Sequence, residues 1–348
     1  TRHSLPVTPR RSFPTMKVLI TGGAGFLGSH LADAFIARGD EVFCLDTGSE
    51  QKVKHLRPNP QFHYIHESVL NEDMVEAMVA RVDLVYHLAA VVGVEHYVAD
   101  PYKVLNVNVN GTQNVLRACH KHDKKVVFSS TSEVYGRNTK VPFSEDDDRV
   151  LGSTRIDRWC YSTSKAVGEH FAFAYAKMGL QAVIMRYFNA YGPRLDALDQ
   201  GRVITIFLGQ ALRGGPLTIV GDGMQTRCFT YVSDTTRATV AAGLEPAAVG
   251  GIFNIGNDRE TTILELAERV RDRIDETLPL EFVPQERIYG ESYEDIPRRV
   301  PDITRMREVL KVTPDVSLAH GLAETVEWFR NEIATNPVPP TVIAGEGE

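Results

Sequence analysis

The sequence predicts an α/β protein built around a doubly wound parallel sheet, with a smaller α/β lobe towards the C-terminus. Short, fully apolar runs such as residues 18–20 are typical of strands buried on both faces of a parallel sheet. Helical segments separate these strands as far as residue 187, which is the order of a doubly wound fold. Beyond it, short strands and helices mix irregularly. We therefore expect a sheet domain over residues 16–187 and an interleaved smaller lobe over residues 188–334.

A glycine-rich turn follows the first strand and predicts a ligand. Gly22 permits a tight turn, Gly25 lets the backbone approach a pyrophosphate, and Gly28 lets a helix over residues 26–38 pack close to the strand. The N-terminus of that helix directs amide groups at the phosphates. The next strand ends at Asp46, whose carboxylate can accept hydrogen bonds from an adenosine ribose. This order indicates a Rossmann-type domain that binds NAD, the alternative being a purely structural turn.

Composition and charge exclude several classes of partner. A net charge of -7 over 348 residues argues against nucleic acid or an anionic membrane as the main partner. No apolar run approaches the roughly 18 residues of a membrane span. The 4 cysteines form no CxxC pair and the 11 histidines no HExxH pattern, so we expect no disulfide, no metal and a cytoplasmic location. Residues 1–15 and 335–348 are expected to be a disordered leader and tail.

Small and hydroxyl-bearing residues gather where the predicted strands end. Leu88, Ala89 and Ala90 close the fourth strand and leave room for a cofactor where the strand order of the sheet reverses. The fifth strand runs into Ser129 and a series of hydroxyls that ends at Glu133, whereas a simple loop more often carries turn residues. Beyond the first two strands, strands are expected at residues 62–65, 84–88, 125–128, 182–185, 217–220 and 252–255.

Two helices carry polar residues with open interpretations. A helix over residues 102–120 contains Asn108, for which ordinary packing and support of the site are both open. A helix that begins near Tyr161 places Lys165 one turn further on the same face. A Tyr/Lys pair at this spacing is often only a surface contact. Because it follows a hydroxyl-rich strand end in a dinucleotide fold, we interpret it as a catalytic pair.

The second part of the chain predicts the other wall of a cleft. It contains a helix that begins at Arg202, the segment 225–231, and helices near residues 262–272 and 318–332. We expect the cleft between the two parts to be the ligand site, as is common between stacked lobes.

Several of these stretches together resemble the extended short-chain dehydrogenase/reductase family of nucleotide-sugar epimerases, dehydratases and decarboxylases. They are TGGAGFLG, Asp46, SSTSEVYG, YSTSK and FNAYGPR, within a resemblance that covers residues 16–330. Within the family, TSEVYG, RWCY at 158–161 and residues 289–302 are most similar to UDP-glucuronate decarboxylases. The resemblance implies that Arg299 binds a sugar carboxylate and that Ser68 stands beside the adenine.

Three sets of site residues follow from the motifs and the resemblance. The catalytic set is Thr131, Ser132, Glu133, Tyr161, Lys165 and Arg299. The set for NAD is Gly22, Gly25, Phe26, Leu27, Asp46, Ser68, Val69, Leu88, Ala89, Ala90, Asn108, Ser129, Tyr161 and Lys165. The set for a UDP-sugar is Tyr97, Asn189, Arg194, Arg202, Val203, Gln225, Arg227 and Arg299. The alternative is a solvated salt bridge for Arg194, Arg202 and Arg227, and a contact with the UDP phosphates for Arg299.

The resemblance implies NAD-dependent decarboxylation of UDP-glucuronate, with Tyr161 as the base and Lys165 lowering the pKa of its phenol. A UDP-sugar 4-epimerase is the first alternative, because it would use the same tyrosine and cofactor. A 4,6-dehydratase fits less well, because Ser132 stands where those enzymes carry an acid. A non-catalytic NAD-binding scaffold is the alternative from another class. Relatives form homodimers through two helices, and Phe171, Phe173, Ala174 and Ala176 are compatible with such a face.

Overall fold

The computed structural model describes residues 15–198, 201–285, 296 and 298–335. Apart from residues 15 and 335, the predicted leader and tail lie outside the described residues, as does most of the segment 289–302 that carries part of the resemblance.

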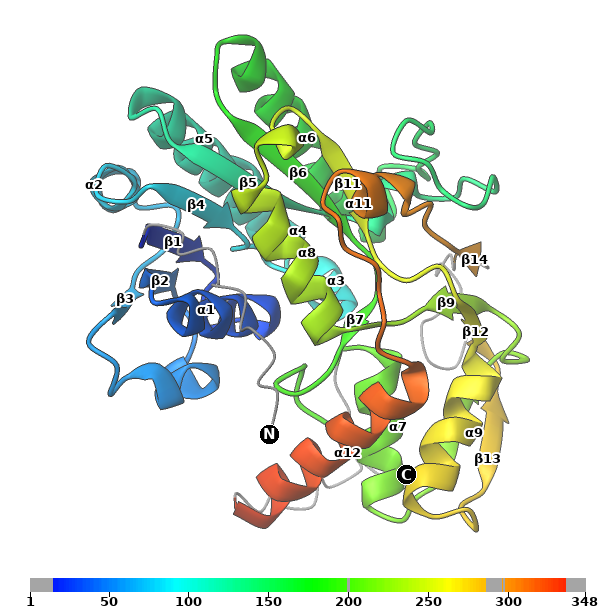
Figure 1. The fold of residues 1–348 in the computed structure, drawn as a ribbon. Helices are drawn as coiled ribbons and strands as arrows, with labels where there is room; N and C mark the ends of the chain where they lie inside the picture. The colour runs from blue at the N-terminus through cyan, green and yellow to red at the C-terminus, as the bar shows by residue number, and fades with distance from the viewer. Residues whose placement is uncertain (1–14, 199–200, 286–295, 297, 336–348) are drawn as a thin grey trace, which may run out of the picture.

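A parallel seven-stranded sheet forms the centre of the first part, as the apolar runs predict (Figure 1). Its order is β11-β6-β5-β4-β1-β2-β3, so the direction of strand succession reverses between β1 and β4. In sheets of this kind the ligand crevice lies outside the carboxyl ends of the strands at that reversal. The strands are β1 (Lys17–Thr21), β2 (Glu41–Asp46), β3 (Phe62–His66), β4 (Leu84–His87), β5 (Lys125–Thr131), β6 (Ala182–Tyr187) and β11 (Ile252–Ile255).

Helices cover both faces of this sheet because alternate residues of each strand point to opposite sides. On one face Leu19, Val85 and Phe128 pack against α2 (Glu72–Val79), α5 (Gly111–Lys121) and α6 (Arg158–Lys177). On the other face Val18 and Ile20 pack with residues of α1 (Phe26–Arg38), α8 (Val232–Leu244) and α11 (Thr304–Glu308). The strand β11 follows the first elements of the lobe in sequence and lies at one edge of the seven-stranded sheet.

The helix predicted over residues 102–120 is not continuous. Following α3 (Val94–Ala99), the chain forms α4 (Pro101–Leu105), a π-helical turn η3 (Asn106–Asn110) and α5. The wider turn is placed beside the cleft, where π-turns often occur at functional sites. It turns the buried Asn108 side chain towards the segment after β4.

The lobe has its own core and three small sheets. Its helices α7 (Val203–Leu212), α9 (Ile263–Ile274) and α12 (Leu318–Thr335) bury Phe207, Leu266 and Leu322 against one another. The small sheets pair β7 (Ala190–Tyr191) with β10 (Thr230–Tyr231), β8 (Leu217–Val220) with β13 (Leu280–Val283), and β9 (Thr226–Cys228) with both β12 (Glu260–Thr262) and β14 (Arg298–Arg299). Short turns complete the chain at η1 (Glu50–Lys52), η2 (Lys54–Leu56), η4 (Ser132–Tyr135) and η5 (Pro246–Ala248).

Among the described residues, none of the helices is both long enough and apolar enough for a membrane crossing.

Candidate active site

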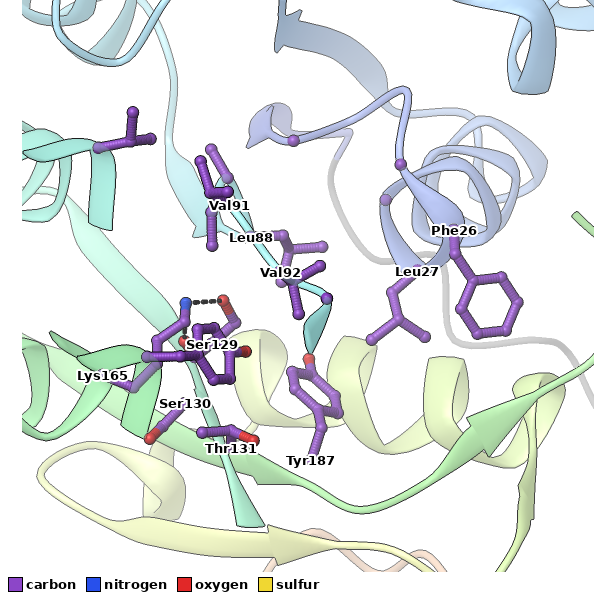
Figure 2. A pocket seen from close by; sticks show the side chains of 18 of the residues that line it. Phe26, Leu27, Leu88, Val91, Val92, Ser129, Ser130, Thr131, Lys165 and Tyr187 are labelled. Carbon is purple, nitrogen blue, oxygen red and sulfur yellow. Dashed lines mark hydrogen bonds between the residues drawn. The ribbon is translucent and has the colours of Figure 1, made fainter. Parts of the chain in front are cut away.

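A cleft of 960 Å³ runs along the carboxyl ends of the central strands and is lined by both parts of the chain. In the view of Figure 2, Leu88, Val91 and Val92 lie between the first turn of α1 and the pair formed by Ser129 and Lys165. The predicted cofactor residues line this cleft, except Asn108, which is buried behind it. The cleft therefore lies where the strand order predicts a nucleotide.

The glycine turn has the geometry that the sequence predicts. Gly22 has φ +73, and a Cβ there would lie 2.6 Å from the amide nitrogen of Ala89. At Gly28 a Cβ would lie 2.1 Å from the carbonyl oxygen of Gly22, so any side chain would push α1 away from β1. Gly25 precedes α1, and no side chain caps that helix. The amides of the first turn can therefore serve a phosphate in the cleft.

Asp46 joins the glycine turn to the adenosine end of the cleft. Its Oδ2 accepts a hydrogen bond from the amide of Ala24 at 2.9 Å, and Oδ1 accepts one from Gly48 at 2.8 Å. Ser68 and Val69 line the cleft beyond it. The glycine cradle, the uncapped helix and this carboxylate together fit the pyrophosphate and ribose of NAD.

Asn108 fixes one wall of the cleft through its side chain. Its Oδ1 accepts from the amide of Val91 at 2.8 Å, and its Nδ2 donates to the carbonyl of Val91 at 3.2 Å and to Ser164 Oγ at 3.1 Å. The side chain thus fixes the segment after β4 to the helix that carries Tyr161. Only the π-turn, which the sequence did not indicate, directs Asn108 to this place.

Tyr161 and Lys165 lie on one face of α6 and both line the cleft. Burial raises the pKa of Tyr161, and the Glu133 carboxylate raises it further, while a hydrogen bond with Thr131 lowers it. Lys165 Nζ donates to the carbonyl oxygen of Ser129 at 2.8 Å and to its Oγ at 3.3 Å. Burial lowers the pKa of Lys165 to about 7, opposed by Glu169.

These contacts correct one expectation. From the sequence we expect Lys165 to lower the pKa of Tyr161, whereas in the structure its ammonium is directed at Ser129 and the protein groups together raise the pKa of the phenol. The hydrogen bond from Thr131 is the predicted contact that favours the phenolate.

A charged cluster lies at the sugar end of the cleft. Glu133 Oε1 lies 3.4 Å from a guanidinium nitrogen of Arg299 and 4.0 Å from one of Arg158. Tyr97 stacks on Tyr161 with ring centroids 4.9 Å apart and planes within 5°. Glu133, Arg299 and Tyr97 line the cleft, so these predicted residues are brought together from three distant parts of the chain.

The predicted substrate residues divide into two groups. Asn189 and Arg202 line the cleft, and Arg202 pairs with Asp196 at 2.6 Å and lies over the Phe26 ring at 5.9 Å. Val203, Gln225 and Arg227 are not among the described residues that line it: Val203 packs against the lobe core, Gln225 donates to the carbonyl of Val220, and Arg227 donates to that of Thr226.

The structure changes the expectation that Arg194 belongs to the substrate site. Its guanidinium pairs with Asp33 on α1 at 2.5 Å and contacts His30 at 2.7 Å, and Arg194 does not line the cleft among the described residues. Since both partners belong to α1, Arg194 joins that helix to the turn after β7. The alternative of a structural salt bridge is therefore the one that the structure supports.

Several lining residues were not singled out from the sequence. A usable signal exists for most of them, since loops after the carboxyl ends of parallel strands face the crevice. Among these residues are Val91, Val92, Gly93, Tyr102, Lys103, Asn106, Val107, Tyr187, Phe188, Asp196 and Gly201. Within the described part of the chain, no group of three or more His, Cys, Asp or Glu side chains is placed to hold a metal ion.

Comparison with known proteins agrees with this geometry. The model of the NAD dependent epimerase/dehydratase family matches residues 18–256, and the chain belongs to that family. It is 42% identical over 315 residues to a UDP-N-acetyl-alpha-D-glucosaminuronate decarboxylase of Bacillus cytotoxicus, covering 90% of this chain and 98% of that protein.

Two further proteins are similar to this chain over most of its length. A UDP-glucuronic acid decarboxylase 1 of Arabidopsis thaliana is 40% identical over 325 residues, which cover 91% of this chain and 71% of that protein. The crystal structure of a UDP-glucuronic acid 4-epimerase from Bacillus cereus, in complex with UDP-glucuronic acid and NAD, superposes with a TM-score of 0.80 at 33% identity, covering 91% of this chain and 99% of the other. The cofactor that the family and this structure indicate is NAD.

Proposed function

We propose that this protein catalyses the NAD-dependent decarboxylation of UDP-glucuronate and gives UDP-xylose, a UDP-4-keto-pentose, or both. The observation that carries the proposal is the cluster beside Tyr161, where the guanidinium of Arg299 lines the cleft and lies 3.4 Å from Glu133. A guanidinium at this place can bind a sugar carboxylate with charge-assisted hydrogen bonds. The similarity to two kinds of nucleotide-hexuronate decarboxylase supports the same reaction.

Tyr161 removes the proton from the 4-hydroxyl of the sugar in this mechanism. Bound NAD supplies an acceptor for the hydride of C4 and later a donor of hydride. Thr131 hydrogen-bonds the phenol and so favours the phenolate. Lys165, which Ser129 holds in the cleft, adds a positive charge near the cofactor site.

Arg299 and Glu133 take part in the next step, in which the carboxyl group is lost and C5 is protonated. The 4-ketone lies β to the C6 carboxylate, so the bond between C5 and C6 can break with its electron pair delocalised into an enolate. Carbon dioxide leaves, and C5 then takes a proton. In this mechanism Arg299 orients the carboxylate before cleavage, and Glu133, 3.4 Å from Arg299, assists protonation of C5. When hydride returns to C4 and UDP-xylose forms, the reaction consumes one proton for each carbon dioxide released. Release of the UDP-4-keto-pentose consumes no net proton and would leave the cofactor reduced.

A second substrate has a specific observation in its favour. The Bacillus cytotoxicus relative, at 42% identity, is named for a sugar that carries an N-acetyl group. UDP-N-acetylglucosaminuronate has the same carboxylate and 4-hydroxyl, so the same cluster could process it. The 4-epimerase alternative is supported by the Bacillus cereus structure.

Proton NMR of the purified protein with each uronate separately tests these proposals. A UDP-pentose or UDP-4-keto-pentose signal supports decarboxylation. The uronate that is converted at the higher rate is the preferred substrate. UDP-galacturonate as the product would instead indicate a 4-epimerase. No change in either spectrum would contradict the proposed function.

We also propose a homodimer in the cytoplasm. Phe173 on α6 is 37% exposed, and the neighbouring α4 exposes Tyr102 and Leu105, whereas Phe171 packs against the core. These exposed apolar side chains support an interface that includes α4 and α6. The four cysteines are free, as in proteins of a reducing compartment. Sedimentation at equilibrium tests the dimer, and Phe173→Asp should weaken it.

A further inference from the structure

Glu133 lies between two buried arginines that come from opposite parts of the molecule. Arg158 is the first residue of α6 and is 5% exposed, and Arg299 on β14 is 7% exposed. Glu133 Oε1 lies 4.0 Å from a guanidinium nitrogen of Arg158 and 3.4 Å from one of Arg299. Arg299 lines the cleft, whereas Arg158 is not among the described lining residues. The carboxylate therefore has one partner inside the cleft and one behind it.

Both contacts are looser than a charge-assisted hydrogen bond, which typically measures about 2.7–2.9 Å. Glu133 Oε2 and Arg299 Nε are both buried, and neither has a hydrogen-bond partner among the described residues. Buried charges are normally paired and hydrogen-bonded, so Arg299, which lines the cleft and has an unsatisfied Nε, is suited to accept one further carboxylate.

We propose that Arg158 is a positioning residue, which holds Glu133 in place while Arg299 turns from Glu133 to the carboxylate of the substrate. The inference deepens the proposed decarboxylation and rests on it. Once Arg299 binds the carboxylate of the substrate, Glu133 keeps its contact with Arg158 behind the cleft. Arg158 stays in position because it is buried and its guanidinium lies over the Trp159 ring at 5.7 Å. Glu133 then remains beside Tyr161, where it can take part in the protonation of C5.

The proposal predicts different kinetic effects for the two arginines. Arg299→Gln removes a group that binds substrate, so KM for UDP-glucuronate should rise about 100-fold, as for a truncated buried charge pair. Arg158→Gln should leave KM within about 2-fold and lower kcat about 30-fold, because only the steps after C4 oxidation need Glu133. In single turnovers the Arg158 variant should therefore accumulate reduced cofactor, seen as absorbance at 340 nm, because hydride cannot return to C4 until C5 has taken its proton.

A double-mutant cycle tests whether Arg158 acts through Glu133. In a Glu133→Gln background, Arg158→Gln should change kcat by less than about 2-fold, because the carboxylate that it positions is gone. Exposed Arg155, which lies three residues before Arg158, gives the matched control, and Arg155→Gln should match the wild type. Arg158→Lys should likewise keep KM unchanged and lower kcat, but by less than Arg158→Gln does. If Arg158→Gln does not fold, Arg158→Lys is the variant to measure.

The outcomes separate this inference from the proposed function. A rise in KM for Arg158→Gln like that of Arg299→Gln, a loss of cofactor reduction, or additive effects with Glu133→Gln would each overturn the positioning role. Each of these results can be obtained while the wild type still releases carbon dioxide. If the wild type releases none from either uronate, it is the proposed function that fails.

Discussion

The two ends of the cleft are built in different ways. The nucleotide end is organised around one continuous stretch, Lys17 to Asp46, in which β1, a glycine turn, α1 and β2 follow each other directly, and Ser68 and Val69 lie beyond it. The sugar end is made of side chains from η4, α6 and β14, and Glu133 and Arg299 are 166 residues apart in sequence. The geometry of a continuous stretch can be predicted from its local sequence pattern. The cluster of Glu133 and Arg299 forms only when the lobe packs on the sheet.

The largest expected effect is on the chemistry of the sugar end. Tyr161→Phe keeps the buried ring but removes the hydroxyl that takes the proton, so turnover should fall by about 10³-fold with an unchanged melting temperature. Tyr175→Phe, the same change further along α6, is the control and should behave as the wild type. Activity above a tenth of the wild type in Tyr161→Phe would show that another group is the base.

The nucleotide end should instead respond through folding and cofactor content. Gly28→Ala places a Cβ 2.1 Å from the carbonyl oxygen of Gly22, which forces α1 away from β1. We expect a loss of about 3 kcal/mol in the free energy of unfolding, as for an overpacked core, and purified protein without NAD. Gly215→Ala, where the nearest atom is 3.5 Å away, is the control for denaturation and NAD content. If Gly28→Ala had wild-type stability, the close packing of α1 on β1 at this position would be contradicted.

The junction between the two parts should be sensitive to pH. Burial lowers the pKa of His30, which contacts Arg194, to about 4, against an ordinary 6.5. Because the folded state binds its proton less readily than the unfolded state, stability from this group is complete above pH 6.5 and is lost as pH falls towards 4. Between pH 7 and pH 4.5 we expect a loss of about 2 kcal/mol.

Urea denaturation of His30→Gln measures this contribution. The variant should lose less stability over that range than the wild type, whereas a variant of exposed His66 should follow the wild type. Parallel curves for His30→Gln and the wild type would assign the pH dependence to other groups.

The smallest expected effect concerns cofactor choice at Asp46. Asp46→Asn removes the negative charge that would repel a 2′-phosphate but keeps an oxygen for the amide of Ala24. The ratio of the dissociation constants for NAD and NADP should shift towards NADP by about 10-fold, or 1.4 kcal/mol. Competition of NADP with bound NAD measures this ratio. An unchanged ratio would mean that discrimination depends on other residues.

The sequence by itself determined the elements whose cause is local. The predicted bounds of α1 and of the strands β8 and β11 agree with the structure, because apolar runs and breaking residues within a few positions set them. The predicted helix 102–120 was wrong in part, since the π-turn at Asn106–Asn110 comes with the packing of Asn108 against Val91 and Ser164. No local pattern specifies such a contact.

The arginines show what only the tertiary structure decided. From the sequence, Arg194, Arg202, Arg227 and Arg299 were all candidates for the substrate site, with a salt bridge the stronger alternative for Arg194 and Arg299 singled out by the resemblance. Packing of the lobe on the sheet turns Arg299 and Arg202 into the cleft and Arg194 onto Asp33 of α1. It also buries Arg158 behind Glu133. The sequence determines which chemical groups the chain carries, and long-range packing decides which of them meet, because a side chain reaches only what the fold brings within a few ångströms of it.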